Sequence, residues 1–287
     1  MTNIKYAFWG TGPLAESVLY ALYKNDLAPL LVITKPDGKV GRKQEVISPQ
    51  IKTWCDMKGI KVYQPETLKD NLELQNILKD IDMSIVASYG KIIPEEILNM
   101  PRLGFLNVHP STLPLYRGPS PIESQLLTGA KEIGISIMKL DKEMDHGPIL
   151  IQSMLDINDN DTSHTVEIKS GQAGGELLSQ IFESYVSCNL IAKEQDHSLA
   201  TFCKFVNKVD GEIKLTDGIE IIKNKFRAYT PWPGIFFMHT HNENNIRVKI
   251  SAINFEANSI EELIQKVIPE GKSEMTFESF KNGYIVN

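Results

Sequence analysis

Residues 104–118 read Gly104-Phe-Leu-Asn-Val-His-Pro-Ser-Thr-Leu-Pro-Leu-Tyr-Arg-Gly118, an apolar run that ends abruptly in a proline-rich turn. The run predicts a strand that stops at Pro110. Side chains two residues apart in a strand point to the same face, so Asn107 and His109 would project together near the carboxyl end. In open α/β sheets, ligands bind outside the carboxyl ends of the strands. An amide donor beside an imidazole suits a site that stabilises a developing oxyanion and handles a proton.

Similar apolar runs alternate with helical patterns through the first two-thirds of the chain. Alternation of this kind predicts βαβ units and an α/β fold with a Rossmann-like parallel sheet, whose strand carboxyl ends share one edge. The predicted strands are Ile4–Trp9, Leu30–Thr34, Ile60–Tyr63, Met83–Ala87, Gly104–His109, Ile133–Met138 and Ile149–Leu155. The predicted helices are Pro13–Lys24, Gln50–Lys58, Glu66–Leu78, Pro121–Leu127 and Asp161–Leu190, the last broken or kinked around Gly171–Gly175. Lys35–Pro49 is predicted to be a polar loop.

The pattern changes from about Phe205 onward, where short alternating runs indicate strands separated by turns. The sequence therefore predicts a first domain over residues 1–190, a linker over 191–207, and a smaller β-rich domain over 208–287. In that smaller domain the predicted strands are Glu212–Leu215, Ile235–His239, Ile246–Ile253, Glu274–Phe277 and Tyr284–Val286. Helices are predicted at Ile219–Tyr229 and Ser259–Val267.

Composition limits where the protein works and what it contacts. No apolar run approaches the roughly 20 residues that span a bilayer, so no membrane association is expected. Three widely spaced cysteines among 287 residues fit a reducing cytoplasm without a disulfide framework. The formal net charge of −6 weakly opposes a simple nucleic-acid binder, although local basic patches matter more than totals.

Two motifs resemble cofactor sites, and neither is complete. Gly10-Thr-Gly12-Pro-Leu-Ala15 matches a loose dinucleotide fingerprint, but the second predicted strand ends without the acid that would hold a ribose. The glycines are better explained by a tight turn, so no nucleotide cofactor is expected. His239-Thr-His241 lacks a third ligand, so no metal is expected there either.

The segment 104–118 resembles the folate-dependent formyltransferases, whose pattern is Asn-x-His followed by Ser-Leu-Leu-Pro and Arg-Gly. The loop Asp141–Pro148 carries Asp145 where that family places an Asp-x-Gly acid. The resemblance implies that Asn107, His109 and Asp145 form the catalytic triad. Taken alone, Asn107 and His109 could equally be a capped strand end with a structural histidine.

The residue types suit formyl transfer, which passes through a tetrahedral carbon bearing an oxyanion. The Asn107 amide could donate one hydrogen bond to that oxygen, and a protonated His109 could donate a second. A carboxylate near the imidazole would orient it and favour its charged form.

The same resemblance implies a folate co-substrate, 10-formyltetrahydrofolate. Its binding segment would be Ser111, Thr112, Leu113 and Pro114, with Thr112 where the family has leucine. Tyr89, from the run Ser88-Tyr89-Gly90, would help to wall the pterin pocket. The alternatives are a surface turn for the segment and a purely packing role for Tyr89.

Within the superfamily the chain is most similar to the methionyl-tRNA formyltransferases. Thr34–Pro49 resembles their Pro-Asp…Gly-Arg…Ser-Pro loop, Arg227–Gly234 their Arg-x-x-x-Pro-Trp-Pro-Gly signature, and His197–Lys208 their linker. The resemblance implies initiator methionyl-tRNA as the acceptor, a small OB-like β-barrel at the C-terminus, and a monomer. The implied substrate-binding residues are Arg42, Lys43 and Arg117.

Two other functions remain open at this point. Asp145-His-Gly-Pro is also similar to the formyltransferases that act on sugars and on glycinamide ribonucleotide, so an amino-sugar nucleotide is an alternative acceptor. A folate- or RNA-binding module without turnover is the alternative that involves no catalysis.

Overall fold

The computed structural model describes residues 4–40, 44–241 and 243–284. The chain divides into two compact units, each assembled from separate stretches of sequence. The first comprises Met1–Pro121, Glu132–Leu155 and Glu167–Cys203, and the second comprises Ile122–Lys131, Asp156–Val166 and Lys204–Asn287. Within the described residues, no helix is long and apolar enough to cross a membrane.

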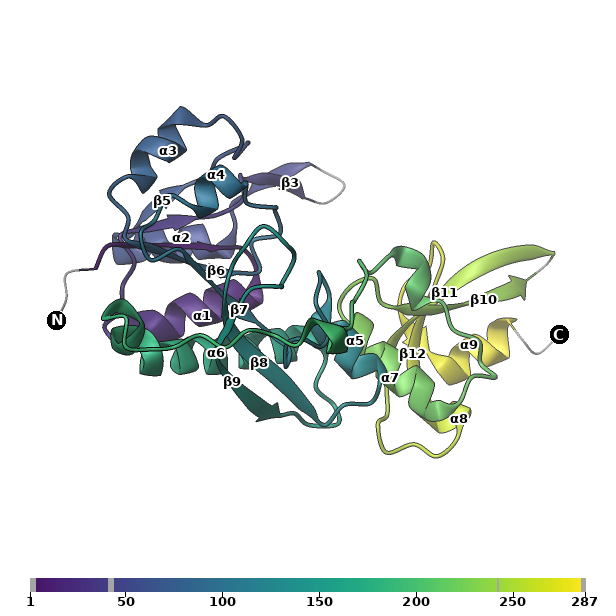
Figure 1. Cartoon of the computed structure of the whole chain (residues 1–287). Coiled ribbons are helices and arrows are strands. Elements are labelled where there is room, and N and C mark those ends of the chain that lie inside the picture. Colours follow the sequence, from purple (N-terminus) through teal and green to yellow (C-terminus); the bar gives the residue numbers. More distant parts are fainter. Residues whose placement is uncertain (1–3, 41–43, 242, 285–287) are drawn as a thin grey trace. The chain divides into compact units, whose positions relative to one another are not determined.

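A seven-stranded sheet forms the centre of the first unit (Figure 1). Its spatial order is β5-β2-β1-β6-β7-β8-β9, and every pair from β5 to β7 is parallel. The strands are β1 (Tyr6–Gly10), β2 (Leu31–Ile33), β5 (Lys61–Tyr63), β6 (Met83–Ala87), β7 (Phe105–His109), β8 (Glu132–Lys139) and β9 (Ile149–Asp156). The order reverses between β1 and β6, which is the point where open α/β sheets form their ligand crevice. The predicted fold class is thus confirmed.

Helices cover both faces of this sheet (Figure 1). Ala7, Trp9 and Phe105 pack on one face with α3 (Leu72–Leu78) and α4 (Glu95–Leu98). Tyr6 points to the other face, where its ring meets Phe182 of α6 (Ser163–Val186) edge-on at 5.7 Å. The alternation follows the two-residue pleat of a strand. Because Asn107 and His109 share a face with Phe105, they lie on the side of the sheet that carries Trp9.

The long helix α6 corrects one expectation. Residues 171–175 were predicted to break or kink it, but α6 is continuous from Ser163 to Val186. A methyl group on Gly171 would come within 2.4 Å of the Leu14 carbonyl oxygen, and one on Gly175 within 2.8 Å of the Val18 oxygen. Both partners belong to α1 (Pro13–Lys24). The glycines therefore let two helices approach closely, which is a packing role that sequence periodicity does not reveal.

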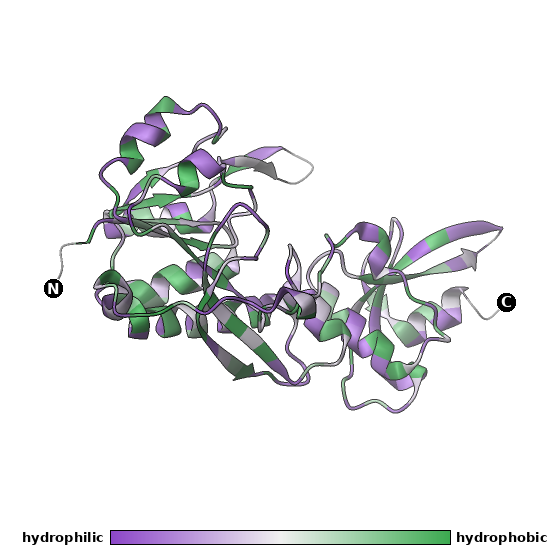
Figure 2. Ribbon diagram, viewed as in Figure 1, coloured by the Kyte–Doolittle hydropathy of each residue, from purple (hydrophilic) through white to green (hydrophobic). Residues whose placement is uncertain are grey.

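Other elements of the first unit also differ from prediction. The segment Lys35–Pro49 contains a hairpin, β3 (Gly38–Val40) and β4 (Glu45–Ile47), and is followed as predicted by α2 (Gln50–Lys58). The helix predicted from Glu66 begins only at Leu72, because the Asn71 side chain caps it by accepting from the Leu74 amide at 2.9 Å. Figure 2 shows this helix α3 alternating between hydrophobic and hydrophilic colouring, as expected for a helix with one buried face.

A four-stranded antiparallel sheet dominates the second unit. Its order is β10 (Ile235–His241), β11 (Asn244–Ile253), β12 (Ile264–Pro269) and β13 (Met275–Thr276). This unit also contains α7 (Ile219–Tyr229), α8 (Ile260–Leu263), α9 (Phe277–Tyr284), most of α5 (Pro121–Leu127) and the first residues of α6. The helix predicted over Ser259–Val267 is mostly wrong, because β12 begins at Ile264. The strand predicted at Tyr284–Val286 is wrong at Tyr284, which ends α9, and its other residues lie outside the described part of the chain.

The Arg-x-x-x-Pro-Trp-Pro-Gly signature has a visible structural role in this unit. The Arg227 side chain is 3% exposed, and its guanidinium donates to the carbonyl oxygens of Asp161 and Asn158 at 3.0 and 3.1 Å. Arg227 therefore ties the end of α7 to a separate stretch of the chain.

Candidate active site

The carboxyl end of β7 presents an amide and an imidazole on one face. Asn107 is partly exposed, and its side-chain amide has no hydrogen-bond partner among the residues that the structure describes. His109, two residues further along, is 4% exposed. The two side chains are separated by about 7 Å along the strand. The strand therefore offers a free amide donor close to an enclosed imidazole.

The loop after β8 brings the acid to this pair by a route that the sequence analysis did not foresee. The sequence predicted a parallel sheet, but β8 runs antiparallel to β7. The loop consequently starts beside Phe105, where the Leu140 amide donates to the Phe105 oxygen at 2.9 Å. It then travels the length of β7, roughly 13 Å, to place Asp145 beside His109.

The three predicted triad residues belong to one site. The Nδ1 atom of His109 lies 3.7 Å from Oδ1 of Asp145, and its Nε2 atom lies 3.0 Å from the carbonyl oxygen of Tyr116. A carbonyl oxygen only accepts, so Nε2 carries the proton and donates to Tyr116. The Nδ1–Oδ1 distance exceeds a hydrogen bond, which leaves room for a third atom to interact with Nδ1.

Asp145 is held by the backbone around it. Its Oδ2 atom accepts a hydrogen bond from the Gly118 amide at 2.8 Å, and its φ of +50° lies in the left-handed region. Non-glycine residues seldom adopt this conformation, and residues that do cluster at functional sites. The carboxylate is therefore oriented toward His109 by a specific donor and by a specific backbone turn.

Gln195 supports the same loop from behind. Its Nε2 atom donates to the carbonyl oxygens of Asp145 and Gly147 at 2.9 and 2.7 Å, and its Oε1 atom accepts from Arg117. Arg117 is 4% exposed and also donates to Nδ1 of His197 at 2.8 Å. The Arg117 guanidinium is thus engaged within the protein, and its predicted substrate contact stays a prediction.

Two further histidines lie next to the triad. His146 pairs through Nδ1 with Oδ2 of Asp141 at 2.7 Å. Its ring stacks on His197, with centroids 3.9 Å apart and planes 4° from parallel. His146 therefore links the loop, through Asp141 and His197, to the segment that carries Gln195.

The predicted folate segment has both inward and outward side chains. Ser111 is fully buried, and its hydroxyl donates to the Leu115 oxygen at 2.6 Å. Leu113 is 3% exposed, and its amide donates to Oγ of Ser136 at 3.1 Å. Thr112 and Pro114 are partly exposed and are the side chains available to a ligand.

Tyr89 lies in the core of the first unit. It is 2% exposed, and its ring meets Trp9 edge-on at 5.3 Å. Its hydroxyl has no hydrogen-bond partner among the described residues, and burial raises the pKa of Tyr89 to about 12. This geometry fits a purely packing role for Tyr89, and a contact between Tyr89 and folate stays a prediction.

The hairpin β3–β4 is anchored at its base by one carboxylate. Asp37 accepts hydrogen bonds from Lys52 at 2.8 Å, from Gln64 at 2.8 Å and from Ser48 at 3.0 Å. The bonds from Lys52 and then Gln64 lower the pKa of Asp37 to about 2. The predicted basic tip, Arg42 and Lys43, lies outside the described residues.

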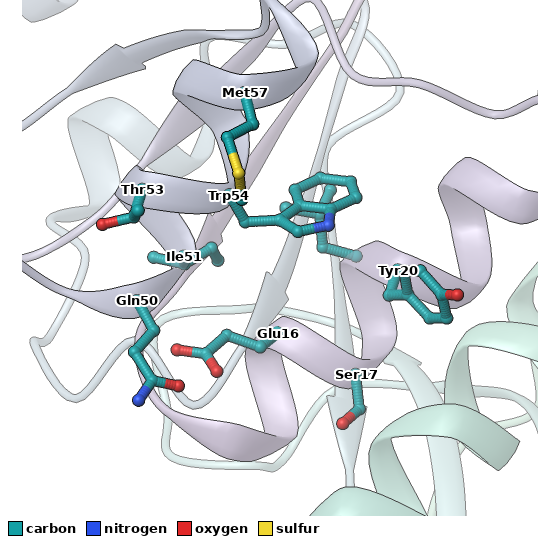
Figure 3. A pocket seen from close by; sticks show the side chains of 9 residues that line it. Glu16, Ser17, Tyr20, Gln50, Ile51, Thr53, Trp54 and Met57 are labelled. Atoms are coloured by element: carbon teal, nitrogen blue, oxygen red, sulfur yellow. The ribbon is translucent and has the colours of Figure 1, made fainter.

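A separate hollow of about 530 Å³ lies between α1 and α2 (Figure 3). Trp54 and Met57 line it from α2, and Glu16 and Tyr20 line it from α1. None of the predicted site residues that the structure describes lines this hollow. Within the described part of the chain, no group of three or more His, Cys, Asp or Glu residues is placed to hold a metal ion.

The residues that support His109 and Asp145 in the structure were not predicted from the sequence. The Tyr116 carbonyl and the Gly118 amide are backbone atoms, whose roles depend on a turn that residue identity does not specify. Gln195 sits in a polar stretch without periodicity, and no sequence signal marks it.

Comparisons with known proteins identify the family of this chain. The family model described as "Formyl transferase" matches residues 3–182, and the model described as "Formyl transferase, C-terminal domain" matches residues 206–263. The methionyl-tRNA formyltransferase of Dictyoglomus thermophilum is 35% identical over 311 residues, covering 99% of this chain and 98% of the relative. That of Thermotoga maritima is 34% identical over 307 residues, covering 99% and 96%.

A solved structure shares the fold at lower identity. The N-formyltransferase of Helicobacter canadensis, crystallised with folinic acid and dTDP-3-aminofucose, is 21% identical. It superposes with a TM-score of 0.62 over 92% of this chain and 94% of that chain.

Proposed function

Because this chain belongs to the formyl transferase family, we propose that it formylates the methionine carried by initiator tRNA, with 10-formyltetrahydrofolate as the donor. The observation that carries the proposal is the meeting of His109 and Asp145, 3.7 Å apart, beside the unpaired amide of Asn107. The full-length similarity to methionyl-tRNA formyltransferases supports the choice of acceptor.

The residues divide the chemistry between them. The methionyl amino nitrogen attacks the formyl carbon, and the carbonyl oxygen becomes an oxyanion as the carbon turns tetrahedral. Asn107 donates a hydrogen bond to that oxygen. A protonated His109 donates a second from Nδ1, while its Nε2–H group keeps its hydrogen bond to the Tyr116 oxygen.

Collapse of the intermediate restores the carbonyl on the methionyl nitrogen and breaks the bond to N10 of the folate. The amino nitrogen loses one proton overall, and N10 gains one. The Asp145 carboxylate balances the charge of a protonated His109 until it receives the proton from the amino nitrogen, directly or through water; that proton then passes to N10 as the bond to the folate breaks. The transfer consumes no oxidant or reductant.

The substrates would occupy different parts of the molecule. Thr112 and Pro114 would contact the folate, and the hairpin with Arg42 and Lys43 would seat the acceptor stem. The linker over 191–207 and the C-terminal domain over 208–287 would bind tRNA phosphates locally, since the net charge is −6. A monomer acting in the cytoplasm, where translation occurs, completes the proposal.

The direct test is formylation of methionyl-tRNA by the purified protein with 10-formyltetrahydrofolate. We expect formyl-methionyl-tRNA to accumulate, and elongator methionyl-tRNA to be a poorer acceptor. Formylation of an amino-sugar nucleotide or of glycinamide ribonucleotide alone would contradict the acceptor and retain the reaction. Inertness with every acceptor would favour a binding module.

A further inference from the structure

The side chain of Gln195 makes an unusually complete set of contacts beside the triad. It is 6% exposed. Its Oε1 atom accepts from Nη2 and Nε of Arg117 at 2.7 and 3.2 Å. Its Nε2 atom donates to the oxygens of Asp145 and Gly147 at 2.9 and 2.7 Å. The amide cannot be reversed, because its NH₂ group would then face a guanidinium and its oxygen two carbonyls.

The segment that carries Gln195 is itself fixed on both sides. Before it, Lys193 exchanges two backbone hydrogen bonds with Ile149, at 2.8 and 2.7 Å. After it, the Arg117 amide donates to the Thr201 oxygen, and the Cys203 amide donates to the Arg117 oxygen. Gln195 is therefore a rigid point from which the loop can be held.

The loop needs such an external hold. Asp145 has a left-handed backbone, which is unfavourable for a residue with a Cβ. Gly147 passes so close to the Lys139 oxygen that a Cβ would lie 2.1 Å from it. The two carbonyls that Gln195 binds, those of Asp145 and Gly147, flank this tight passage.

We propose that Gln195 is a positioning residue: it holds the strained loop so that the Asp145 carboxylate faces His109. The inference rests on the proposed function only in assigning a catalytic consequence to that orientation. The glutamine touches neither substrate nor reacting atoms, and it acts through the backbone of the acid.

The decisive variant is Gln195→Glu. It keeps oxygen acceptors for Arg117 and removes the N–H donors that face the carbonyls of Asp145 and Gly147. The variant therefore tests the contact with the loop separately from the contact with Arg117. We expect kcat to fall roughly 10- to 100-fold, with the KM for the folate donor changed less than about twofold. Gln172→Glu, the same change on the exposed side of α6, is the matched control and should behave as wild type.

A double-mutant cycle separates positioning from general damage. In an Asp145→Asn background, Gln195→Glu should lower kcat by less than about twofold, because the group it positions is already lost. A full 10- to 100-fold loss in that background would overturn the proposal, as would an unchanged kcat in the single variant.

Hydrogen exchange provides a readout that is independent of turnover. Backbone amides of residues 141–148 should exchange at least about tenfold faster in Gln195→Glu, while those of β1 and β6 should not change. If the loop amides exchange at the same rate in Gln195→Glu and in the wild type, Gln195 does not hold the loop, whether or not an acceptor substrate is known. If the wild-type protein does not formylate methionyl-tRNA but loop exchange still rises in Gln195→Glu, only the proposed function is contradicted, and the positioning role of Gln195 stands.

A third measurement uses the wild-type protein and does not depend on whether a variant folds. In the wild-type protein, the two side-chain amide protons of Gln195 should be visible by NMR as a slowly exchanging pair. Rapid exchange with solvent would show that the contact is absent and would overturn the proposal.

Discussion

The triad and the base of the hairpin β3–β4 are built in opposite ways. His109 is 4% exposed, and Asp145 is held by a backbone amide, a left-handed turn and the Gln195 contact. At the base of the hairpin, the Asp37 side chain bonds to the side chains of Lys52, Ser48 and Gln64 in a solvent-exposed cluster. The comparison indicates that the proposed chemistry is preorganised by backbone, whereas the proposed recognition element is secured by ionic contacts that solvent can weaken.

We expect the largest effect from a substitution at His109. His109→Ala removes the imidazole from between Tyr116 and Asp145, and we expect kcat for formylation to fall about 10³- to 10⁴-fold. Folate affinity, measured by fluorescence titration, should change less than about threefold. Exposed His164→Ala is the control, and a loss of less than tenfold in His109→Ala would remove this residue from the chemistry.

Asn107→Ala should have the next largest effect. The variant deletes one hydrogen-bond donor to the developing oxyanion, which typically lowers turnover about 10²- to 10³-fold. Single-turnover kinetics with saturating donor would measure the chemical step directly. A change confined to KM would mean that Asn107 binds the ground state and not the transition state, with Asn76→Ala as the matched surface control.

At the hairpin β3–β4, we expect a substitution to change KM and not kcat. Asp37→Asn loosens the base of the hairpin, and we expect the KM for methionyl-tRNA to rise about three- to tenfold because fewer molecules hold the hairpin in place. The kcat at saturating tRNA should stay within about twofold of wild type. Asp56→Asn, on the same helix as Lys52, is the control, and a large loss of kcat in Asp37→Asn would erase the contrast between the two regions.

The smallest effect is a response of the hairpin to acid. The pKa of the Asp37 carboxyl is lowered to about 2, chiefly by its bond from Lys52, so this group stabilises the fold fully above its ordinary pKa of 3.8. The contribution is lost as the pH falls through 2. An NMR titration of the Asp37 carboxyl carbon should therefore be flat from pH 7 to about 4, and a midpoint near 4 would show that the contact does not persist in solution.

The sequence was sufficient for the elements whose cause is local. Alternating apolar runs predicted most of the strands, and the Asn107–His109 spacing placed both side chains on one face of β7. Where the cause was distant, prediction failed. Ile264 and Val267 fit a helix as well as a strand until the pairing with β11 selects the strand. The glycines of α6 looked like breaks because their reason, the close backbone of α1, lies about 155 residues earlier in the chain.

The same contrast between local and distant causes holds for the candidate site. His109 was proposed from its spacing and residue type, and Asp145 from the family resemblance. The antiparallel direction of β8 and the backbone donor of Gly118 depend on long-range pairings that the local sequence does not indicate. Arg117 was predicted to bind substrate from the family resemblance, and nothing in the local sequence indicates its partners within the protein. Its partners, Gln195 and His197, lie about 80 residues away.

The backbone pairing of Lys193 with Ile149 and of Arg117 with Thr201 and Cys203 has a practical consequence for cutting this protein. A fragment that stops near residue 190 would keep the whole seven-stranded sheet and every triad residue. It would nevertheless lack the stretch that braces the acid. An expression fragment meant to retain turnover on a minimal acceptor therefore has to run through Cys203, and a protease cut between 190 and 203 should silence the enzyme without unfolding it.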